Sequence, residues 1–431
     1  MSSGLLMECR LARGYTLENT PDALAYLLIK VMPDSSIQAG SLPLNISLVI
    51  DVSRSMAGEK IRYACEAAKL LVKSLRNEDL ISIITFSDEA TLLVPTTGPS
   101  DKPHIQSEID GIKIQSGTRM SLGMDRSVRE IQGTSSPEKV SQIILLTDGQ
   151  TENQKSCQNI AIQAREKQIG VTTIGIGEKY NEGLLAQIAD ATLGRFYHLK
   201  TPLQIVDIFQ KEFDNATDSA ISRVSLSFRL ENSVRFESLD RIFPSSAKLQ
   251  TRSGVRGKVL TADIGAVGKD RPIIVGAQLK LPARPPGNMK VAHVSISYSI
   301  PGHEIEDITC SRDVFTEYTS DQSLCTQVDR EVIGYFSQIN AQKFIEQAIA
   351  ETKQGNVSDA TRSLFEAQEI TQRLGNLPLA ENIKEAIKEL GQSGTISEDG
   401  IKTIKAGSRF TIRLDKAKNS ERDKDNAKEP E

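Results

Sequence analysis

The chain reads Ile-Ser-Leu-Val-Ile-Asp-Val-Ser-Arg-Ser-Met-Ala-Gly from Ile46 to Gly58, and this stretch decides the fold of its middle part. The first five residues are nearly all apolar, as in a strand that is buried on both faces of a parallel sheet. A helix is predicted over 59–75, because apolar residues recur there every three or four positions. A buried strand that leads straight into an amphipathic helix is typical of an α/β domain.

The same alternation of short apolar strands and amphipathic helices continues as far as Phe213. Further strands are expected at 80–86, 90–94, 142–146, 171–176 and 194–198. Helices are expected near 103–109, 121–131, 156–168, 182–189 and 205–213. We therefore predict a doubly wound, Rossmann-like α/β domain over residues 44–216.

Beyond Thr217 the spacing between apolar residues changes from three or four positions, as in helices, to two positions. Val224, Leu226 and Phe228 alternate with polar residues, which indicates strands with one buried face. Short strands separated by Gly- and Pro-rich turns predict an all-β sandwich over 217–320. The extended run 25–31 has no useful partner in a parallel sheet, so we expect residues 1–43 to join this sandwich. The α/β domain would then be an insertion between strands of the β-domain.

Residues 325–395 carry apolar stripes at helical spacing and predict a small bundle of three helices. The remainder, 396–431, is expected to be extended or disordered. Within it, basic and apolar residues of 401–414 alternate loosely, as in a strand. The preferred interpretation is a strand that packs on the chain itself. The alternative is a peptide that adds to another protein's sheet edge, with Thr411 as a phosphorylation site.

Composition excludes several classes of function. Net charge is −4 and aromatic residues make up 5% of the chain, with no Trp, so a nucleic-acid-binding surface is not expected. The first ten residues lack the features of a signal peptide, and no apolar run is long enough for a transmembrane helix. The 5 cysteines are scattered, without a Cys-x-x-Cys pair. These features predict a reduced, cytoplasmic protein without a membrane span.

Polar side chains follow two of the predicted buried strands. Asp51, Ser53 and Ser55 come directly after the strand at 46–50, and Asp148 follows the strand at 142–146. Ligands of open α/β sheets bind at the carboxyl ends of the strands, where the strand order reverses. Alternation along an extended turn points the side chains at positions 51, 53 and 55 the same way. Thr118, in the loop 115–119, is expected to face them.

Three hydroxyls and two carboxylates form an oxygen-only ligand set, which suits a hard cation. We predict Mg²⁺, with Mn²⁺ or Ca²⁺ as alternatives. Because hydroxyls add no charge, the ion would stay partly uncompensated and would attract an outside carboxylate. Each residue also has a plainer interpretation. Ser53 or Ser55 alone is a common helix N-cap, and Thr-Asp-Gly at 147–149 is a common turn.

Taken together and in this order, the residues Asp51-x-Ser53-x-Ser55, Thr118 and Asp148 resemble the metal-ion-dependent adhesion site of von Willebrand factor A (VWA) domains. The resemblance covers about Leu44 to Phe213. It implies that the serines and the threonine ligate a metal, and that the aspartates ligate it directly or through water. The chain is also similar to bacterial VWA proteins with a following β-domain and helices, and to inter-alpha-trypsin inhibitor heavy chains.

The resemblance implies a non-enzymatic scaffold or adaptor that binds an acidic residue of a partner protein through Mg²⁺. It further implies partners such as AAA+ ATPases of the MoxR kind or kinase/phosphatase signalling modules. An extracellular adhesion protein is the first alternative. A metal-dependent phosphohydrolase is the second, although neither a second carboxylate cluster nor a general base accompanies the predicted site. The sequence has no Gly-x-Ser-x-Gly motif and no P-loop.

Overall fold

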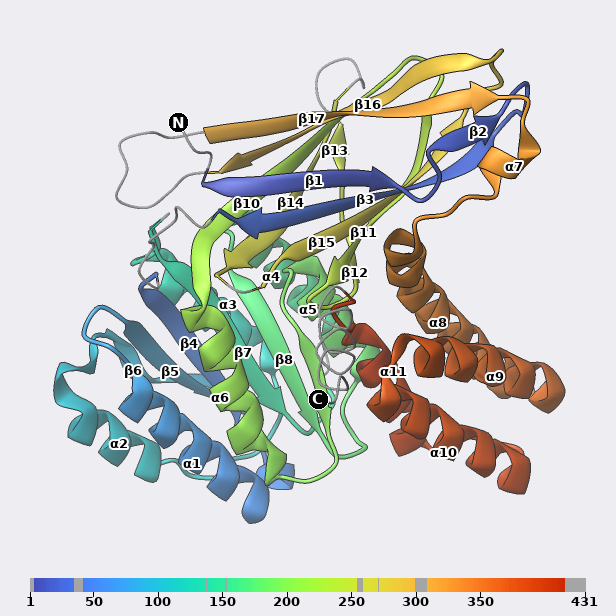
Figure 1. Ribbon diagram of the computed structural model, residues 1–431. Coiled ribbons are helices and arrows are strands. Elements are labelled where there is room, and N and C mark those ends of the chain that lie inside the picture. Colours follow the sequence, from blue (N-terminus) through green and yellow to red (C-terminus); the bar gives the residue numbers. More distant parts are fainter. Residues whose placement is uncertain are drawn as a thin grey trace, which may run out of the picture.

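The computed structural model describes residues 4–34, 42–136, 138–151, 153–253, 259–269, 271–298 and 308–414. Figure 1 shows an α/β part, a β-rich part that lies across one end of it, and a group of C-terminal helices beside both. This arrangement confirms the predicted fold class: an α/β domain, an all-β region and a helical region.

The central sheet of the α/β part has the strand order β6-β5-β4-β7-β8-β9. All neighbours pair in parallel except β5 and β6. Because β4 lies between β5 and β7, the strand order reverses at β4, as predicted for a doubly wound sheet. The strands are β4 (Leu44–Asp51), β5 (Leu80–Phe86), β6 (Ala90–Thr97), β7 (Val140–Thr147), β8 (Gly170–Ile176) and β9 (Phe196–Leu199).

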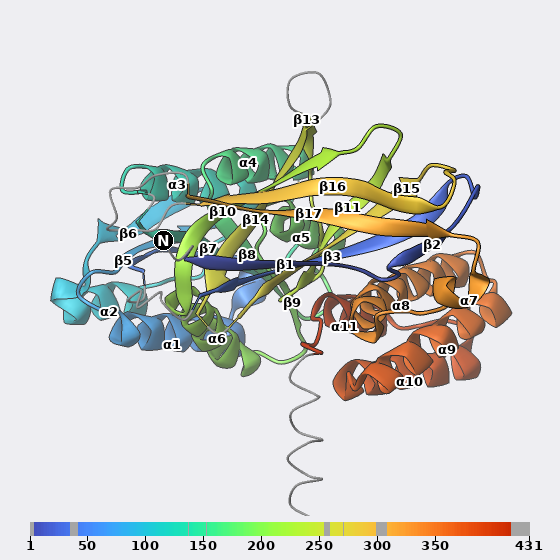
Figure 2. The ribbon, with the colours of Figure 1, turned by 45° about the horizontal axis from the view of Figure 1, so that its top comes forward.

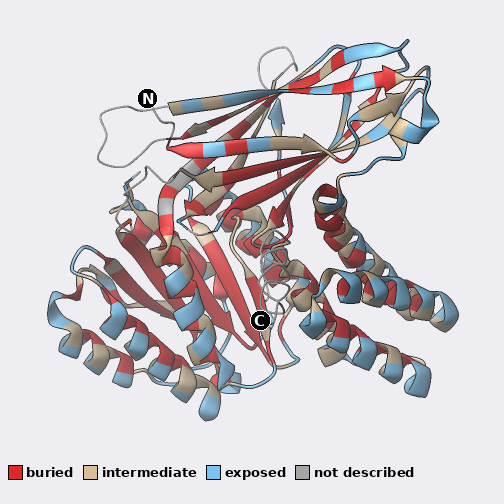
Figure 3. Ribbon diagram, in the orientation of Figure 1, coloured by how far each residue is buried: buried red, intermediate tan, exposed pale blue. Residues whose placement is uncertain are grey.

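Helices cover both faces of this sheet, which explains why its strands other than the edge strand β6 are buried almost throughout (Figures 2 and 3). One apolar cluster joins a sheet face to α1 (Glu59–Ser74), α2 (Lys102–Asp110) and α6 (Gln204–Thr217). A second cluster joins the other face to α3 (Met120–Gln132), α4 (Gln154–Glu166) and α5 (Glu182–Ala191). The continuous apolar runs seen in the sequence are therefore strands that lie between two helical layers.

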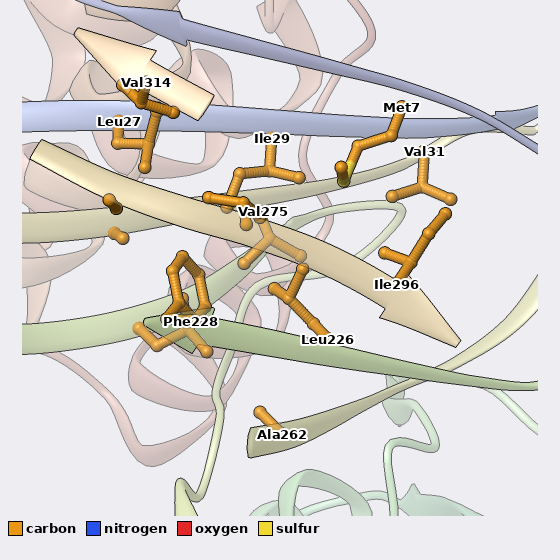
Figure 4. Packing of buried hydrophobic residues seen from close by; sticks show 14 of the residues in the cluster. Met7, Leu27, Ile29, Val31, Leu226, Phe228, Ala262, Val275, Ile296 and Val314 are labelled. Carbon is orange, nitrogen blue, oxygen red and sulfur yellow. The ribbon is translucent and has the colours of Figure 1, made fainter. Parts of the chain in front are cut away.

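The β-rich part consists of two sheets with the orders β1-β3-β15-β11-β12 and β13-β14-β10-β16-β17-β2. Both contribute to one core, which includes Leu27, Val275 and Phe228 (Figure 4). The strands are β1 (Leu5–Leu11), β2 (Tyr15–Leu17), β3 (Ala23–Pro33), β10 (Ser219–Leu230), β11 (Arg235–Phe243), β12 (Ala247–Lys248), β13 (Arg252–Ser253), β14 (Val259–Gly268), β15 (Ile273–Leu281), β16 (Gly287–Tyr298) and β17 (Ile308–Thr319).

The N-terminal strands belong to this β-rich part. Strand β3 pairs with β15 over its whole central portion, with Ile29 opposite Val275, and β1 pairs with β3 on its other side. The chain thus begins in the β-rich part, forms the whole α/β sheet, and returns through β10. The two connections lie side by side, because the Leu42 amide before β4 donates to the Ser219 carbonyl after α6 at 3.3 Å.

The C-terminal region contains α7 (Gln322–Cys325), α8 (Arg330–Lys353), α9 (Val357–Leu374), α10 (Leu377–Ser393) and α11 (Glu398–Arg409). The start of α8 packs on β3, β11 and β15 through Tyr335 and Phe336. Its later part forms a separate apolar core with α9, α10 and α11. The helical region is therefore anchored to the β-rich part at one end.

Helix α11 corrects the prediction that 396–431 is extended or disordered. Ser397 caps this helix, because its Oγ accepts a hydrogen bond from the Gly400 amide at 3.0 Å. The helix is buried on two sides: Ile404 lies in the core of the helical region and Ala406 lies against the α/β part. Of the apolar residues whose alternation suggested a strand, Ile404 lies in α11, whereas Phe410, Ile412 and Leu414 follow the helix.

The segment after α11 also packs on the chain itself, against β11 and α8. The Thr411 hydroxyl donates to the Ile242 carbonyl oxygen at 2.5 Å, and the Ile412 amide donates to the Gln338 side chain at 2.8 Å. These contacts favour the interpretation of 401–414 as a segment that packs on the chain itself. The rest of the predicted tail, 415–431, lies outside the described residues.

Among the described residues, no helix is both long enough and apolar enough to cross a bilayer.

Candidate metal centre

The predicted site residues lie at the carboxyl edge of the central sheet, where its strand order reverses. Asp51 is the last residue of β4, and Asp148 directly follows the last residue of β7. These strands pair in parallel with Ile50 opposite Leu146, so both carboxylates leave the same edge of the sheet, one residue apart in register. Both aspartates are buried, with 0% exposure for Asp51 and 1% for Asp148. The edge therefore carries two acidic groups that are largely removed from solvent.

The loop between β4 and α1 places Ser53 and Ser55 beside the aspartates. Residues 54–56 form a single 3₁₀ turn, and Ser53 makes no side-chain capping bond to any described residue there. Helix α1 begins after Gly58, whose φ of 86° is a conformation that favours glycine. The two serines are therefore not N-caps of α1, which removes the plainer interpretation of these hydroxyls.

Hydrogen bonds connect the serines to both aspartates. The Ser53 amide donates to Asp51 Oδ1 at 2.8 Å, and the Ser55 hydroxyl donates to Asp148 Oδ1 at 2.6 Å. The Ser53 and Ser55 hydroxyl oxygens lie 3.1 Å apart. The two aspartates and two serines thus form one continuous polar cluster that spans two strands.

The loop 115–119 brings Thr118 to the same cluster. Its backbone is fixed at both ends, because the Gln115 amide donates to the Val52 carbonyl at 2.7 Å and the Arg119 amide donates to the Ser87 carbonyl at 2.7 Å. A Cβ atom built on Gly149 would lie 3.4 Å from Thr118 Oγ1 and 3.9 Å from Asp51 Oδ2. Thr118 therefore lies beside Gly149 and near Asp51, next to the polar cluster that the other four predicted residues form.

Two residues of this centre were not singled out from the sequence. The Thr147 hydroxyl donates to Asp51 Oδ2 at 2.6 Å, which orients the Asp51 carboxylate. The Lys60 ammonium, from the first turn of α1, forms an ion pair with Asp148 Oδ2 and also donates to the Ser55 carbonyl at 3.3 Å. The phrase Gly58-Glu-Lys60 could have indicated a cation near the loop, but its partner is 88 residues away.

Electrostatics at the centre favour a cation. Burial is the main cause that raises the pKa of Asp51, and the charge of Asp148 raises it further, although hydrogen bonds from Thr147 and Ser53 act in the opposite direction. A carboxylate that is costly to ionise in a buried position is stabilised by a nearby positive charge. Lys60 compensates one of the two carboxylates. The remaining negative charge and the hydroxyl oxygens are available to a further cation.

The donor set also fits a hard divalent ion. It contains only oxygen atoms, from two carboxylates and three hydroxyls, whereas zinc sites usually contain His or Cys. In the described part of the chain, no group of three or more His, Cys, Asp or Glu side chains could hold a metal. The polar cluster is consistent with that result, because it contains two side chains of these types, Asp51 and Asp148, and its other oxygen ligands are hydroxyls. The residues present therefore fit Mg²⁺ better than a transition metal.

Comparison with known proteins identifies two parts of the chain. Residues 45–211 match the family model of the von Willebrand factor type A domain, and residues 330–414 match that of the Sll0103-like C-terminal alpha-helical domain. The uncharacterized protein sll0103 of Synechocystis sp. is 24% identical over 286 residues, which cover 65% of this chain and 67% of that protein. YfbK of Escherichia coli is 27% identical over 174 residues, or 39% of this chain and 30% of YfbK.

A solved structure, a von Willebrand factor type A protein from Catenulispora acidiphila, has the same fold along nearly the whole chain. Its TM-score is 0.82 with 16% sequence identity, and the superposition covers 94% of this chain and 97% of that one. At this identity the likeness concerns the fold alone. The family models assign two of the three parts of the architecture. The chain thus carries a VWA domain and, after the β-rich part, an Sll0103-like C-terminal helical domain.

Proposed function

We propose that the chain is a non-enzymatic scaffold or adaptor that binds an acidic residue of a partner protein through Mg²⁺. The ion would be held by Asp51, Ser53, Ser55, Thr118 and Asp148. Domains of the VWA family are typically metal-dependent protein-interaction modules, which supports this proposal at the level of the family. When bound, the ion supplies a positive charge that can accept an oxygen ligand from outside the chain.

The observation that carries the proposal is the charge of the polar cluster. Its hydroxyls are neutral, and one of its two carboxylates, Asp148, already forms an ion pair with Lys60. The protein ligands therefore compensate a divalent ion incompletely, and a carboxylate from a partner would complete its charge balance. Arg54, which is exposed at the rim of the cluster, adds further positive charge beside the approach of such a partner.

We also propose that this role is cytoplasmic. The cysteines of the described residues are all free thiols, as is typical of proteins in reducing compartments. An AAA+ ATPase or a kinase/phosphatase signalling module is the proposed class of partner. The helical region lies beside the α/β part and would offer that partner a second contact surface (Figure 1).

Affinity capture with the full chain tests the proposal. Immobilised protein is incubated with an extract of its own cells in Mg²⁺ or in EDTA, and the retained proteins are identified and quantified. We expect at least one abundant partner that is retained in Mg²⁺, released by EDTA, and recovered when Mg²⁺ is restored. A partner that is retained equally in EDTA would contradict the metal bridge.

Substitution of Lys60 by methionine is expected to raise the affinity for Mg²⁺ by about tenfold, because it removes a positive charge that contacts the Asp148 carboxylate. Lys73→Met is the matched control, since Lys73 lies exposed in the last turn of the same helix. Calorimetric titration with Mg²⁺ measures the effect. An affinity that falls in Lys60→Met, or that rises equally in the control, would show that Lys60 does not compete with the ion.

A further inference from the structure

A cavity of about 180 Å³ lies at the opposite edge of the central sheet from the metal centre. Its wall includes the first residues of β7 and β8, so the length of these strands separates it from Asp148. The other side of the wall comes from β11 and β14 of the β-rich part. The cavity therefore lies at the junction of the VWA domain and the β-rich part, and its space is several times what one water molecule needs.

Basic side chains dominate the wall of this cavity among the described residues. The basic residues are Lys139, Arg165, Arg195, Arg241 and Arg271. The acidic residues are Asp218 and Asp263. An excess of positive charge around a partly enclosed space is costly, because guanidinium groups repel each other more strongly where water is excluded.

Part of this positive charge is compensated within the protein. Arg195 Nη1 lies 3.2 Å from the buried carboxylate of Glu212, which stands behind the wall. Arg271 lies 3.9 Å from Asp218. Asp263 has an ion pair of its own with Arg252, at 3.6 Å. These pairs account for both acidic residues of the wall.

Arg165 and Arg241 are different, because neither has a carboxylate within 4.0 Å in the part of the chain that the structure describes. They are buried to 9% and 5% exposure. Arg241 donates to the carbonyls of Leu193 at 3.0 Å, Ser245 at 3.1 Å and Gly194 at 3.4 Å and to the Ser245 hydroxyl at 2.9 Å. Arg165 donates to the Ala191 carbonyl at 3.1 Å. Carbonyls satisfy hydrogen bonds but supply no net charge.

Neighbouring charges also act on the two guanidinium groups. Burial is the main cause that lowers the pKa of Arg241 to about 10; the charges of Arg195 and Arg165 lower it further, and that of Asp190 acts in the opposite direction. Burial is also the main cause that lowers the pKa of Arg165, which the charge of Asp263 raises and that of Arg252 lowers. Several cations thus lie close enough to repel each other around one cavity, and an anion between them would relieve this repulsion.

We propose that this cavity binds a small phosphate-type oxyanion, either inorganic phosphate or a small phosphate monoester. The Arg165 guanidinium donates to Ala191 through one nitrogen, and its remaining N–H groups suit phosphate oxygens. The charges of Arg165 and Arg241 together match a dianion. Because the wall comes from both the VWA domain and the β-rich part, the bound anion would join these two parts. The site is separate from the metal centre and does not depend on the proposed function.

Arg165 is the residue to replace, because Arg241 also links the two parts through its bonds to the Leu193 and Gly194 carbonyls. Arg165→Gln keeps a donor for the Ala191 carbonyl but removes the charge. Arg129→Gln is the matched control, since Arg129 is exposed on α3 and forms its ion pair with Asp125. Both variants are compared with the unchanged full chain by thermal unfolding without added anion, which shows whether either substitution affects the fold.

Calorimetric titration with inorganic phosphate, and separately with glycerol phosphate, measures binding at constant ionic strength. We expect saturable binding of at least one of them, and an affinity lower by about tenfold or more in Arg165→Gln but unchanged in Arg129→Gln. Preference between the two probes shows whether the site takes free or esterified phosphate. The absence of saturable binding by both, or equal binding by Arg165→Gln and the unchanged chain, would overturn the proposal.

Discussion

Substitution of Asp51 by asparagine is expected to lower the affinity for Mg²⁺ by at least about a hundredfold, since two unit charges at 4 Å near a protein surface attract each other by about 4 kcal/mol. Asparagine has the same size and keeps an oxygen that accepts from the Ser53 amide. Because burial raises the pKa of Asp51, a neutral side chain suits this position in the absence of metal. We therefore expect little change in the free energy of unfolding. Calorimetric titration with Mg²⁺ measures the affinity.

Asp125→Asn is the control for this substitution, because Asp125 lies on α3 at the surface and its partner is Arg129. It makes the same change of charge away from the polar cluster. Mg²⁺ affinity should be unchanged in this variant, and thermal unfolding should show that both variants fold. Retention of the original affinity in Asp51→Asn would exclude Asp51 from the metal centre.

Substitution of Glu212 by glutamine is expected to lower the free energy of unfolding by about 3–5 kcal/mol, which is typical when one partner of a buried ion pair is removed. Glu212 is 0% exposed and pairs with Arg195, so its loss leaves a partly buried cation uncompensated. It also accepts hydrogen bonds from the side chains of Gln142, Thr172, Tyr197 and Asn215. Chemical denaturation monitored by circular dichroism gives the change in stability.

Asp214 is exposed on the same helix and provides the control. Asp214→Asn makes the same change of charge and should change the free energy of unfolding little. In the double variant with Arg195→Met, part of the loss should be recovered, because the uncompensated cation is then absent. A cost below about 1 kcal/mol for Glu212→Gln would show that the ion pair contributes little to the fold.

The same carboxylate gives a pH dependence. Burial by itself raises the pKa of Glu212, but Arg195 and the hydroxyl and amide donors more than offset this, so its pKa lies below the usual value. A group whose pKa is lower in the folded chain than in the unfolded chain stabilises the fold. Its contribution is fully present when the pH lies above the group's pKa in the unfolded chain. This contribution is lost as the pH falls through the folded-state pKa. The difference in stability between the unchanged chain and Glu212→Gln should therefore shrink in acid.

The α/β fold could be predicted from the sequence because each local signal agrees with the others. The strand at 46–50 is apolar on both faces, and the helices that follow it carry apolar stripes at the expected spacing. The polar residues 51, 53 and 55 could be placed at the carboxyl edge for the same reason. The position of Thr118 depends on the hydrogen bonds that fix its loop to Val52 and Ser87. The family motif predicts that Thr118 belongs to the site, but no local sequence pattern does.

The features that were missed depend on contacts between distant parts of the chain. Helix α11 presents single apolar residues to two different cores, so it lacks a continuous apolar stripe that would predict a helix until both cores are known. The ion pair of Lys60 with Asp148 and the burial of Arg165 and Arg241 are likewise properties of the folded chain. Such charges look like ordinary surface residues in the sequence, since Lys and Arg are mostly exposed.

A double-mutant cycle with the partner captured in Mg²⁺ tests the central claim most directly. The Kd in Mg²⁺ is measured for the unchanged pair, for Asp51→Asn alone, for the partner with its acidic residue replaced by the amide, and for both changes together. If the ion bridges the two proteins, each single substitution should abolish most of the binding and the second should add little. Effects that add to within about 0.5 kcal/mol would mean that the two residues act independently, which would contradict the metal bridge.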